Sequence, residues 1–258
     1  MNPIGIFDSG IGGLTIFKEI KNKFPHQDII YLADTAHLPY GEKSKETIIK
    51  LSLQNILFLL NFKVELIIIA CNTCSAVALP SIKEYFRIPI LGVIDPLVKE
   101  ALVYTKNKRI GVIGTNSTIK SKSFQKRLKE LLPSAKIFSK ACPLFVPLIE
   151  ENLTKGEIVL KIIEMYLNDF KRKNIDTLIL GCTHYPLLKD SLNLFFENKV
   201  KLIDAPSSLI KTLKKFLKKE KKRPVYRFFV TDDIQGFKIK AKNLLKEEIK
   251  NIELINYV

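Results

Sequence analysis

Short, continuously apolar runs alternate along the chain with longer segments in which apolar residues recur every three or four positions. The short runs are typical of strands buried on both faces and lie at 4–7, 29–32, 66–70, 110–113, 136–138, 177–180, 201–203 and 227–230. The longer segments predict amphipathic helices, for example at 45–62, 120–131 and 157–171. Strands that alternate with helices in this way favour an α/β fold with mostly parallel sheets flanked by helices.

Two pairs of segments resemble each other and divide the chain into halves. Residues 67–73 and 178–184 each run from an apolar strand through a small residue to a Cys and a polar pair. Residues 4–10 and 110–116 each end an apolar strand in a small, polar loop. The repetition predicts two similar α/β lobes, each with its own sheet, and an active site in the cleft between them.

Proline residues indicate where the chain passes from one lobe to the other. Pro96 and Pro206 interrupt the alternating pattern, so we expect a crossing close to each. The first lobe is then expected to contain residues 1–95 and 207–258, and the second lobe residues 96–206. After Pro206 the pattern continues with a helix, a strand and a helix, which we expect to pack back on the first lobe.

The composition is that of a globular protein. With 258 residues, of which 47% are hydrophobic and 26% charged, the chain can bury a large core without disulfides or metals. The longest apolar stretches, such as 66–71, fall far short of the roughly 18 residues that suggest a membrane span. No secretory signal is visible before the first strand. We therefore expect a cytoplasmic protein that does not enter a membrane.

Basic residues outnumber acidic ones by 42 to 26, which gives a formal net charge of +16. A basic field attracts phosphate polymers, so a basic nucleic-acid-binding protein is an alternative from a different class of function. Much of the excess, however, is lysine between the apolar positions of helical segments such as 209–219, as on a solvated helix face. Helix-turn-helix and zinc-finger spacings are also missing from the sequence. We therefore expect no specific nucleic-acid partner.

The four cysteines favour free or catalytic thiols over a disulfide framework, because no signal peptide is visible. Cys71 and Cys74 form a CxxC pair, but no second CxxC or nearby pair of histidines completes a tetrahedral zinc site, so we expect no metal. The glycines at 10, 12 and 13 lack the last glycine of a dinucleotide fingerprint, since Thr15 stands in its place. These glycines fit a tight turn as well as they fit a ligand contact.

Polar motifs follow several of the predicted strands at the point where each strand ends. They lie at 8–13, 71–73, 115–118 and 182–184. In open parallel sheets, ligands bind beyond the carboxyl ends of the strands. Backbone N–H groups and Ser or Thr hydroxyls at helix starts suit carboxylate ligands. The sequence therefore predicts a small anionic substrate between the lobes.

Cys71 and Cys182 occupy matching positions at the ends of strands in the two predicted lobes. Either cysteine alone is equally compatible with a small, inert, buried side chain. Two thiols that face each other across a cleft, one of them ionised, can remove a proton from one face of a carbon and return one to the other. This exchange inverts a stereocentre. Asp8 and His184 are candidates for the bases that assist Cys71 and Cys182, although a histidine at such a position can also be structural.

Six stretches, spread over almost the whole chain, resemble the glutamate racemases of the cofactor-independent aspartate/glutamate racemase superfamily. They lie at 5–15, 34–41, 70–73, 142–148, 180–188 and 230–233. The resemblance implies interconversion of L- and D-glutamate without a cofactor, which supplies D-glutamate for peptidoglycan, and it implies a homodimer. Aspartate or hydantoin racemisation is the nearest enzymatic alternative.

The resemblance also implies roles for particular residues. Cys71 and Cys182 match the paired acid/base residues, and Asp8 and His184 match the groups that assist them. The positions that match substrate-binding residues are Asp8, Ser9, Tyr40, Gly41, Asn72, Thr73, Thr115, Thr118, Thr183 and His184. Glu150 is expected near His184, where it would bias the protonation of the imidazole, or as an exposed carboxylate at a helix end. Cys74 and Cys142 are expected to pack in the core.

Overall fold

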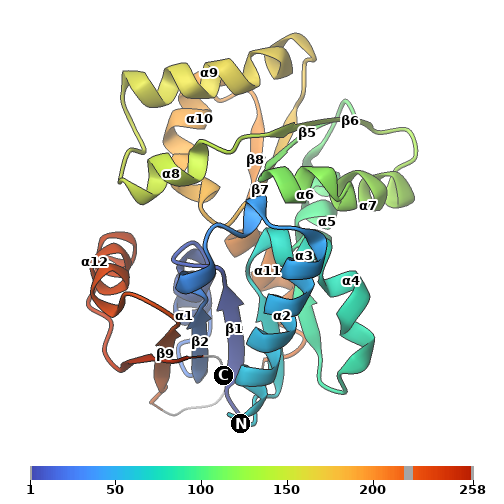
Figure 1. Ribbon diagram of the computed structural model, residues 1–258. Helices are drawn as coiled ribbons and strands as arrows, with labels where there is room; N and C mark the ends of the chain where they lie inside the picture. The colour runs from blue at the N-terminus through green and yellow to red at the C-terminus, as the bar shows by residue number, and fades with distance from the viewer. Residues whose placement is uncertain (1, 218–222, 257–258) are drawn as a thin grey trace.

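The computed structural model describes residues 2–217 and 223–256, which form two wholly parallel sheets (Figure 1). The larger sheet has the order β10-β9-β2-β1-β3-β4, and its strands are β1 (Ile4–Asp8), β2 (Ile29–Ala33), β3 (Leu66–Ile69), β4 (Ile90–Gly92), β9 (Tyr226–Val230) and β10 (Ile252–Leu254). The smaller sheet has the order β6-β5-β7-β8, and its strands are β5 (Arg109–Gly114), β6 (Lys136–Ala141), β7 (Thr177–Gly181) and β8 (Lys201–Ile203). The predicted α/β fold is confirmed.

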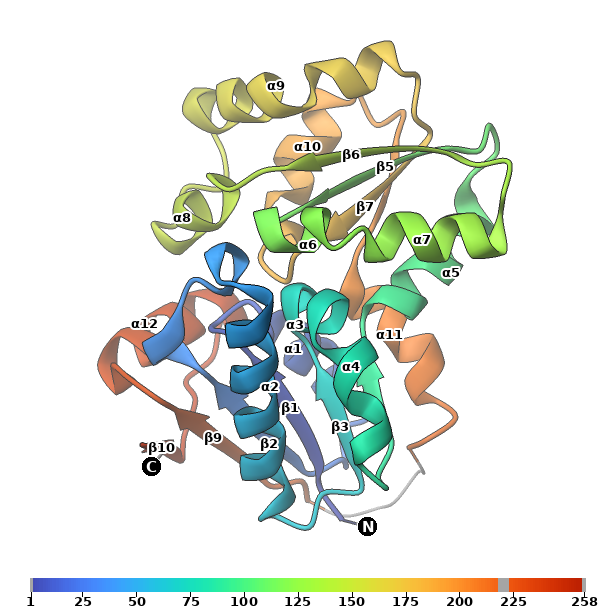
Figure 2. The same ribbon diagram turned by 45° about the vertical axis from the view of Figure 1, so that its right-hand side comes forward.

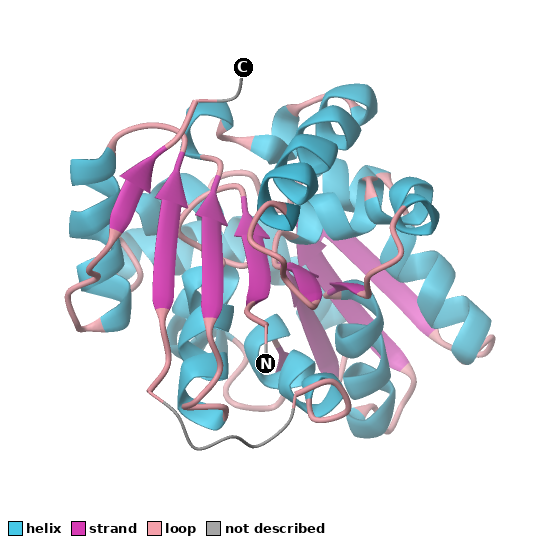
Figure 3. Ribbon diagram, turned by 90° about the horizontal axis from the view of Figure 1, so that it is seen from below, coloured by secondary structure: helices cyan, strands magenta, loops and turns pink. Residues whose placement is uncertain are grey.

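Helices flank both sheets. Those before β5 are α1 (Leu14–Lys23), α2 (Lys45–Leu60), α3 (Asn72–Val77), α4 (Leu79–Ile82) and α5 (Ile94–Tyr104). Those after β5 are α6 (Asn116–Lys120), α7 (Ser123–Leu131), α8 (Phe145–Glu150), α9 (Glu157–Arg172), α10 (Lys189–Phe195), α11 (Ala205–Leu213) and α12 (Ile234–Leu245). Figure 2 shows α9 and α10 on one side of the smaller sheet and α5, α6 and α7 on the other. Figure 3 shows the strands of the larger sheet side by side between helices.

Continuous apolar strands form the centre of each sheet because they are covered on both faces. Every residue of β1, β2, β3 and β7 is buried. Within the described ranges 2–217 and 223–256, no helix combines the length and the hydropathy needed to cross a bilayer. The buried residues of these strands contribute to the two hydrophobic cores of the protein.

The two passages between the sheets are made by α5 and α11, which pack against each other. Pro96 and Pro206 lie in the first turns of these helices, where a missing N–H costs no hydrogen bond, so they begin a helix rather than interrupt one. The predicted lobe boundaries fall in the same turns, and the division at 95/96 and 206/207 stays a prediction. The expected return of the chain is confirmed, since β9 pairs with β2.

Some predicted elements differ in extent from those observed. The segment 120–131 contains two helices, because Lys122 adopts a left-handed backbone conformation with φ of 57° between α6 and α7. In the lysine-rich segment 209–219, α11 ends at Leu213, and residues 218–219 lie outside the described part of the chain. The prediction missed β4 and β10, two edge strands of three residues in which no residue is buried; β8, which is equally short, was predicted and contains the buried Ile203.

The central strands should dominate the stability of the larger sheet. Ile68 is fully buried in β3, so Ile68→Ala is expected to lower the free energy of unfolding by about 2–5 kcal/mol, because the lost methyl groups leave a cavity. Ile158 in α9 is 63% exposed, and Ile158→Ala should change the same quantity by less than about 0.5 kcal/mol. Urea unfolding followed by circular dichroism measures both. Equal effects of the two substitutions would contradict this account of the core.

Candidate functional site

The carboxyl ends of the two sheets face each other, and loops from both meet there. Thr73, after β3, and Thr115, after β5, have hydroxyl oxygens 3.0 Å apart. The Ser117 hydroxyl donates to the carbonyl oxygen of Gly41 at 2.8 Å. These contacts join the larger sheet to the smaller one at the edge where parallel sheets place ligands. The polar motifs predicted at strand ends therefore converge on one region.

Cys71 leads from β3 into α3 and is only 5% exposed. A hydrogen bond from the Cys74 thiol lowers the pKa of Cys71, and one from the Ser9 hydroxyl acts in the same direction. Burial and the nearby carboxylate of Asp8 oppose this effect, but the pKa remains below its ordinary value. Neutral donors thus favour a thiolate at Cys71.

Cys182 follows β7 directly and is 6% exposed. Its sulfur lies 3.8 Å from Nδ1 of His184, and Nε2 of the same ring lies 2.8 Å from Oε1 of Glu150. Burial alone would lower the pKa of His184, but the hydrogen bonds with Cys182 and Glu150 raise it to about 10. His184 is therefore a cation near neutral pH, and it holds positive charge beside the second thiol.

Glu150 ends α8, and its side chain is 16% exposed. Burial would raise the pKa of this carboxyl, but His184 and Lys240 lower it to about 2. Both expectations for Glu150 hold in part, since it stands at a helix end and also contacts His184. Lys240, which donates a hydrogen bond to Oε2 of Glu150, was not predicted, because nothing in the sequence separates it from the many other lysines.

Asp8 connects the surroundings of the two thiols. It ends β1 and is fully buried, with Oδ2 accepting the N–H of Gly10 at 3.0 Å and Oδ1 accepting the Thr183 hydroxyl at 3.3 Å. Burial raises the pKa of Asp8, and the nearby His184 only partly offsets this rise. Asp8 thus interacts electrostatically with Cys71 and is hydrogen-bonded to Thr183 in the loop that carries Cys182. A raised pKa suits a group that exchanges protons.

Gly12 allows the two lobes to approach each other closely. A Cβ atom at this position would lie 2.3 Å from Oγ1 of Thr183 and 2.6 Å from Nδ1 of His184. Any other residue would have to displace these side chains. The sequence left a tight turn and a ligand contact open for the glycine cluster, and the structure adds a third reason, which is packing between lobes.

Asn72 has a buried side-chain amide that the rest of the described chain does not satisfy. The residue is 2% exposed, and neither Oδ1 nor Nδ2 has a hydrogen-bond partner among the described residues. Such groups are rare in folded proteins because each costs about 1–3 kcal/mol. An amide that offers both a donor and an acceptor beside Cys71 is suited to an amino-acid ligand.

Three threonine hydroxyls form a cluster across the junction. Thr73 lies 3.0 Å from Thr115 and 3.2 Å from Thr118, and the last two are 3.0 Å apart. Thr115 is also the N-cap of α6, where it accepts the N–H of Thr118. The structure thus brings together Thr73, Thr115 and Thr118 from the predicted substrate-binding set.

Tyr40 is buried in the predicted region, but its hydroxyl is directed to the interior of the first lobe. It donates to Oδ2 of Asp34 and accepts from Asn55 at 3.2 Å. Thr231 donates to the other oxygen of Asp34 at 2.8 Å. The role of Tyr40 in binding substrate stays a prediction. Asp34 and Thr231 support the loop that carries Gly41, and although both lie in stretches that carried the resemblance, sequence reasoning assigned them no role.

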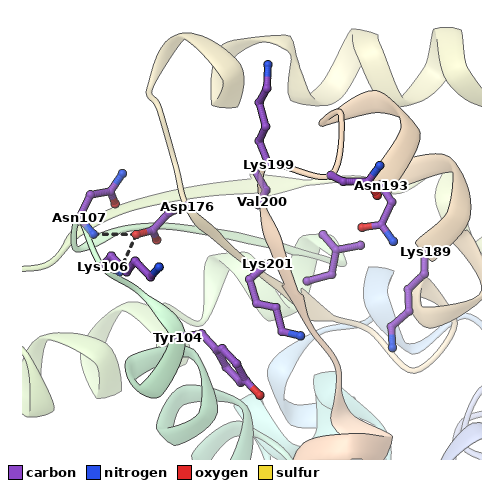
Figure 4. Close-up of a pocket in the computed structure, with 11 residues that line it drawn as sticks. Tyr104, Lys106, Asn107, Asp176, Lys189, Asn193, Lys199, Val200 and Lys201 are labelled. Carbon is purple, nitrogen blue, oxygen red and sulfur yellow. Dashed lines mark hydrogen bonds between the residues drawn. The ribbon is translucent and has the colours of Figure 1, made fainter.

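A separate cavity of about 650 Å³ lies at the opposite end of the smaller sheet (Figure 4). Its basic lining residues are Lys106, Lys189, Lys199 and Lys201. Asp176, which precedes β7, accepts the backbone N–H groups of Lys106 and Asn107 at 2.6 Å each. Because Cys182 follows the other end of β7, this part of the basic excess lies away from the thiols.

Among residues 2–217 and 223–256, no group of three or more His, Cys, Asp or Glu side chains is arranged to hold a metal ion. Each of the four cysteines is a free, buried thiol. Cys142 is fully buried in the core of the second lobe, whereas Cys74, which was expected only to pack, also contacts the sulfur of Cys71.

Comparison with known proteins places these features in a family. Residues 14–213 match the family model described as Asp/Glu/Hydantoin racemase. The glutamate racemase of Aquifex aeolicus is 51% identical over 247 residues, which cover 96% of this chain and 95% of that protein. The crystal structure of the Francisella tularensis glutamate racemase in complex with D-glutamate has a TM-score of 0.91 at 40% identity, and the match covers 99% of this chain and 97% of that one.

A more distant structure shares the fold alone. The Picrophilus torridus aspartate racemase has a TM-score of 0.64 at 18% identity, with 83% of this chain and 93% of that chain covered. The extent of the closer matches, together with the family model, settles the assignment. The chain belongs to the Asp/Glu/hydantoin racemase family.

Proposed function

We propose that the protein interconverts L- and D-glutamate by acid/base catalysis with two thiols and without a cofactor. The observation that carries the proposal is the pair of buried thiols, Cys71 and Cys182, one from each sheet, whose surroundings are joined through Asp8. The high identity to glutamate racemases over nearly the whole chain supports glutamate as the substrate.

Each cysteine acts as the base in one direction of the reaction and as the acid in the other. In one direction, the thiolate of one cysteine accepts the Cα proton and becomes a thiol, while the other thiol donates its proton to the opposite face of the carbon. The opposite direction uses the same groups in reverse. Asp8 beside Cys71 and His184 beside Cys182 then return the sulfurs to their starting protonation states by exchanging protons with them.

The α-hydrogen of an amino acid is a very weak acid, so the carbanion-like transition state needs stabilisation. Donors fixed in a buried site provide it without the reorganisation that water would require. The side chains of Ser9, Asn72 and Thr183 lie beside the thiols and are each no more than 8% exposed. They are suited to holding the substrate carboxylates and amino group. Thr73, Thr115 and Thr118 extend this set from the junction of the two lobes.

Two alternatives receive less support. The aspartate racemase shares only the fold with this chain, so aspartate is the weaker substrate candidate. A nucleic-acid-binding function rests on the +16 charge alone. A role in supplying D-glutamate for peptidoglycan, a cytoplasmic location and a homodimer all follow from the resemblance to glutamate racemases and are part of the proposal.

Removal of either thiol should stop the reaction. Cys71→Ala and Cys182→Ala are each expected to lower the rate of racemisation by about 100- to 10,000-fold, because one proton transfer then lacks its acid or base. Cys142→Ala removes a buried thiol from the core and should keep most of the activity. Polarimetry measures turnover, and circular dichroism checks the fold. Full turnover by either of the first two variants would refute the two-thiol mechanism.

The proton that arrives on the product should come from the solvent. Purified protein incubated with L-glutamate in deuterated water is expected to form D-glutamate with deuterium at Cα, since thiol protons exchange with water between turnovers. Mass spectrometry of the separated enantiomers gives the isotope content. Newly formed D-glutamate that retains the original hydrogen at Cα would exclude this mechanism.

Glu150 should set the pH range in which the enzyme works. Glu150→Gln replaces the carboxylate by a neutral amide, so the pKa of His184 should fall from about 10 towards its ordinary value of about 6.5. The imidazolium is then lost at lower pH, and the alkaline limb of kcat/KM should move down. Glu151→Gln alters the exposed neighbouring carboxylate and should leave the profile unchanged. If the alkaline limb of kcat/KM stays at the same pH in Glu150→Gln, Glu150 does not set the pH range of the reaction.

A further inference from the structure

Lys240 reaches the site from a part of the chain remote from the other site residues. It lies on α12, which follows β9 and packs on α1 of the first lobe. Glu150, by contrast, ends α8 in the second lobe, and α12 lies below α8 in Figures 1 and 2. The contact between Lys240 and Glu150 therefore crosses from one lobe to the other.

The two oxygens of Glu150 have different partners. The Lys240 ammonium donates to Oε2, and Nε2 of His184 lies 2.8 Å from Oε1. The Glu150 carboxylate is thus held by Lys240 from the first lobe and by His184 from the second lobe. These two contacts fix the plane of the carboxylate relative to the imidazole. Without the ammonium, Oε2 would lose this partner, and a carboxylate that is 16% exposed could turn towards water.

We propose that Lys240 is a positioning residue, which holds Glu150 against His184 from the opposite lobe and thereby keeps the imidazole in place beside Cys182. The link of this inference to catalysis rests on the proposed function, because only there does His184 serve Cys182. Lys240 contacts Glu150, and Glu150 contacts His184, so Lys240 acts through Glu150.

The charges around His184 decide the direction of the expected effect. Cys182 and Glu150 contact the ring, and Asp8 interacts with it from the loop after β1. Lys240 is the cation behind Glu150. If it merely screened that carboxylate, its removal would strengthen the attraction of Glu150 for the imidazolium and raise the pKa of His184. If it positions the carboxylate, its removal weakens the hydrogen bond and lowers that pKa.

A second lysine of the same helix, which pairs with a carboxylate beyond the end of the helix, provides a matched control. Lys242 donates to Glu248 at 2.7 Å, and the two side chains are 61% and 71% exposed. Exposed pairs of this kind contribute little to stability. The Lys240–Glu150 pair differs because its carboxylate is mostly buried and holds a second partner. Lys242→Met therefore removes an equivalent charge and ion pair without a path to His184.

The test is titration of the His184 ring by NMR on protein with ¹⁵N-labelled histidine, which is practical because the chain has only three histidines. In Lys240→Met, the midpoint of His184 should fall by at least about one pH unit, and kcat/KM should fall roughly tenfold. Lys240→Arg, which restores a donor of the same charge, should recover most of both values. Lys242→Met should match the wild type.

An unchanged or raised midpoint in Lys240→Met would overturn the positioning role, even if activity fell. Lys240→Gln gives a second, polar variant if the methionine variant folds poorly by circular dichroism. The NMR midpoints do not depend on turnover. A wild-type protein that fails to racemise glutamate would therefore refute the proposed function, while the titration would still decide whether Lys240 positions Glu150.

Discussion

In the proposed reaction, a sulfur atom that takes a proton from carbon must be ionised and yet shielded from water, and the surroundings of both thiols fit this constraint. Burial by itself disfavours a thiolate, so each sulfur needs a compensating partner. Cys71 has neutral donors, the thiol of Cys74 and the hydroxyl of Ser9. Cys182 has His184 beside it, whose pKa is raised by the hydrogen bonds with Cys182 and Glu150. The two lobes thus meet the same requirement with different chemistry.

Parallel sheets place these partners, because the carboxyl ends of adjacent strands emerge together. Asp8 pairs with the last residue of β2, and Gly114 pairs with Gly181, so the loops after β5 and β7 leave the smaller sheet side by side. Two such edges that face each other bring residues distant in sequence within hydrogen-bond reach, as with Thr183 and Asp8. The absence of a side chain at Gly12 lets the edges approach closely.

The sequence predicts those features whose physical cause is local. Strands such as β3 are recognisable because burial on both faces requires an unbroken apolar run, and Cys71 stands out as a candidate because Cys182 occupies the matching position after another such run. The edge strands β4 and β10 bury no residue and so leave no apolar pattern, and the break at Lys122 depends on a single backbone conformation. The contact of Lys240 with Glu150 depends on how two lobes meet, and no property of one lysine among many reveals it.

The unequal surroundings of Cys71 and Cys182 have a consequence for the kinetics of the proposed reaction. Enantiomers have equal free energies in water, so the final mixture is racemic whatever the catalyst. The second-order rate constants for the two directions must then be identical, and no difference between the sulfurs can favour one product. The asymmetry can change KM and kcat for each enantiomer. The two constants must then change by the same factor, so that kcat/KM stays equal for both enantiomers.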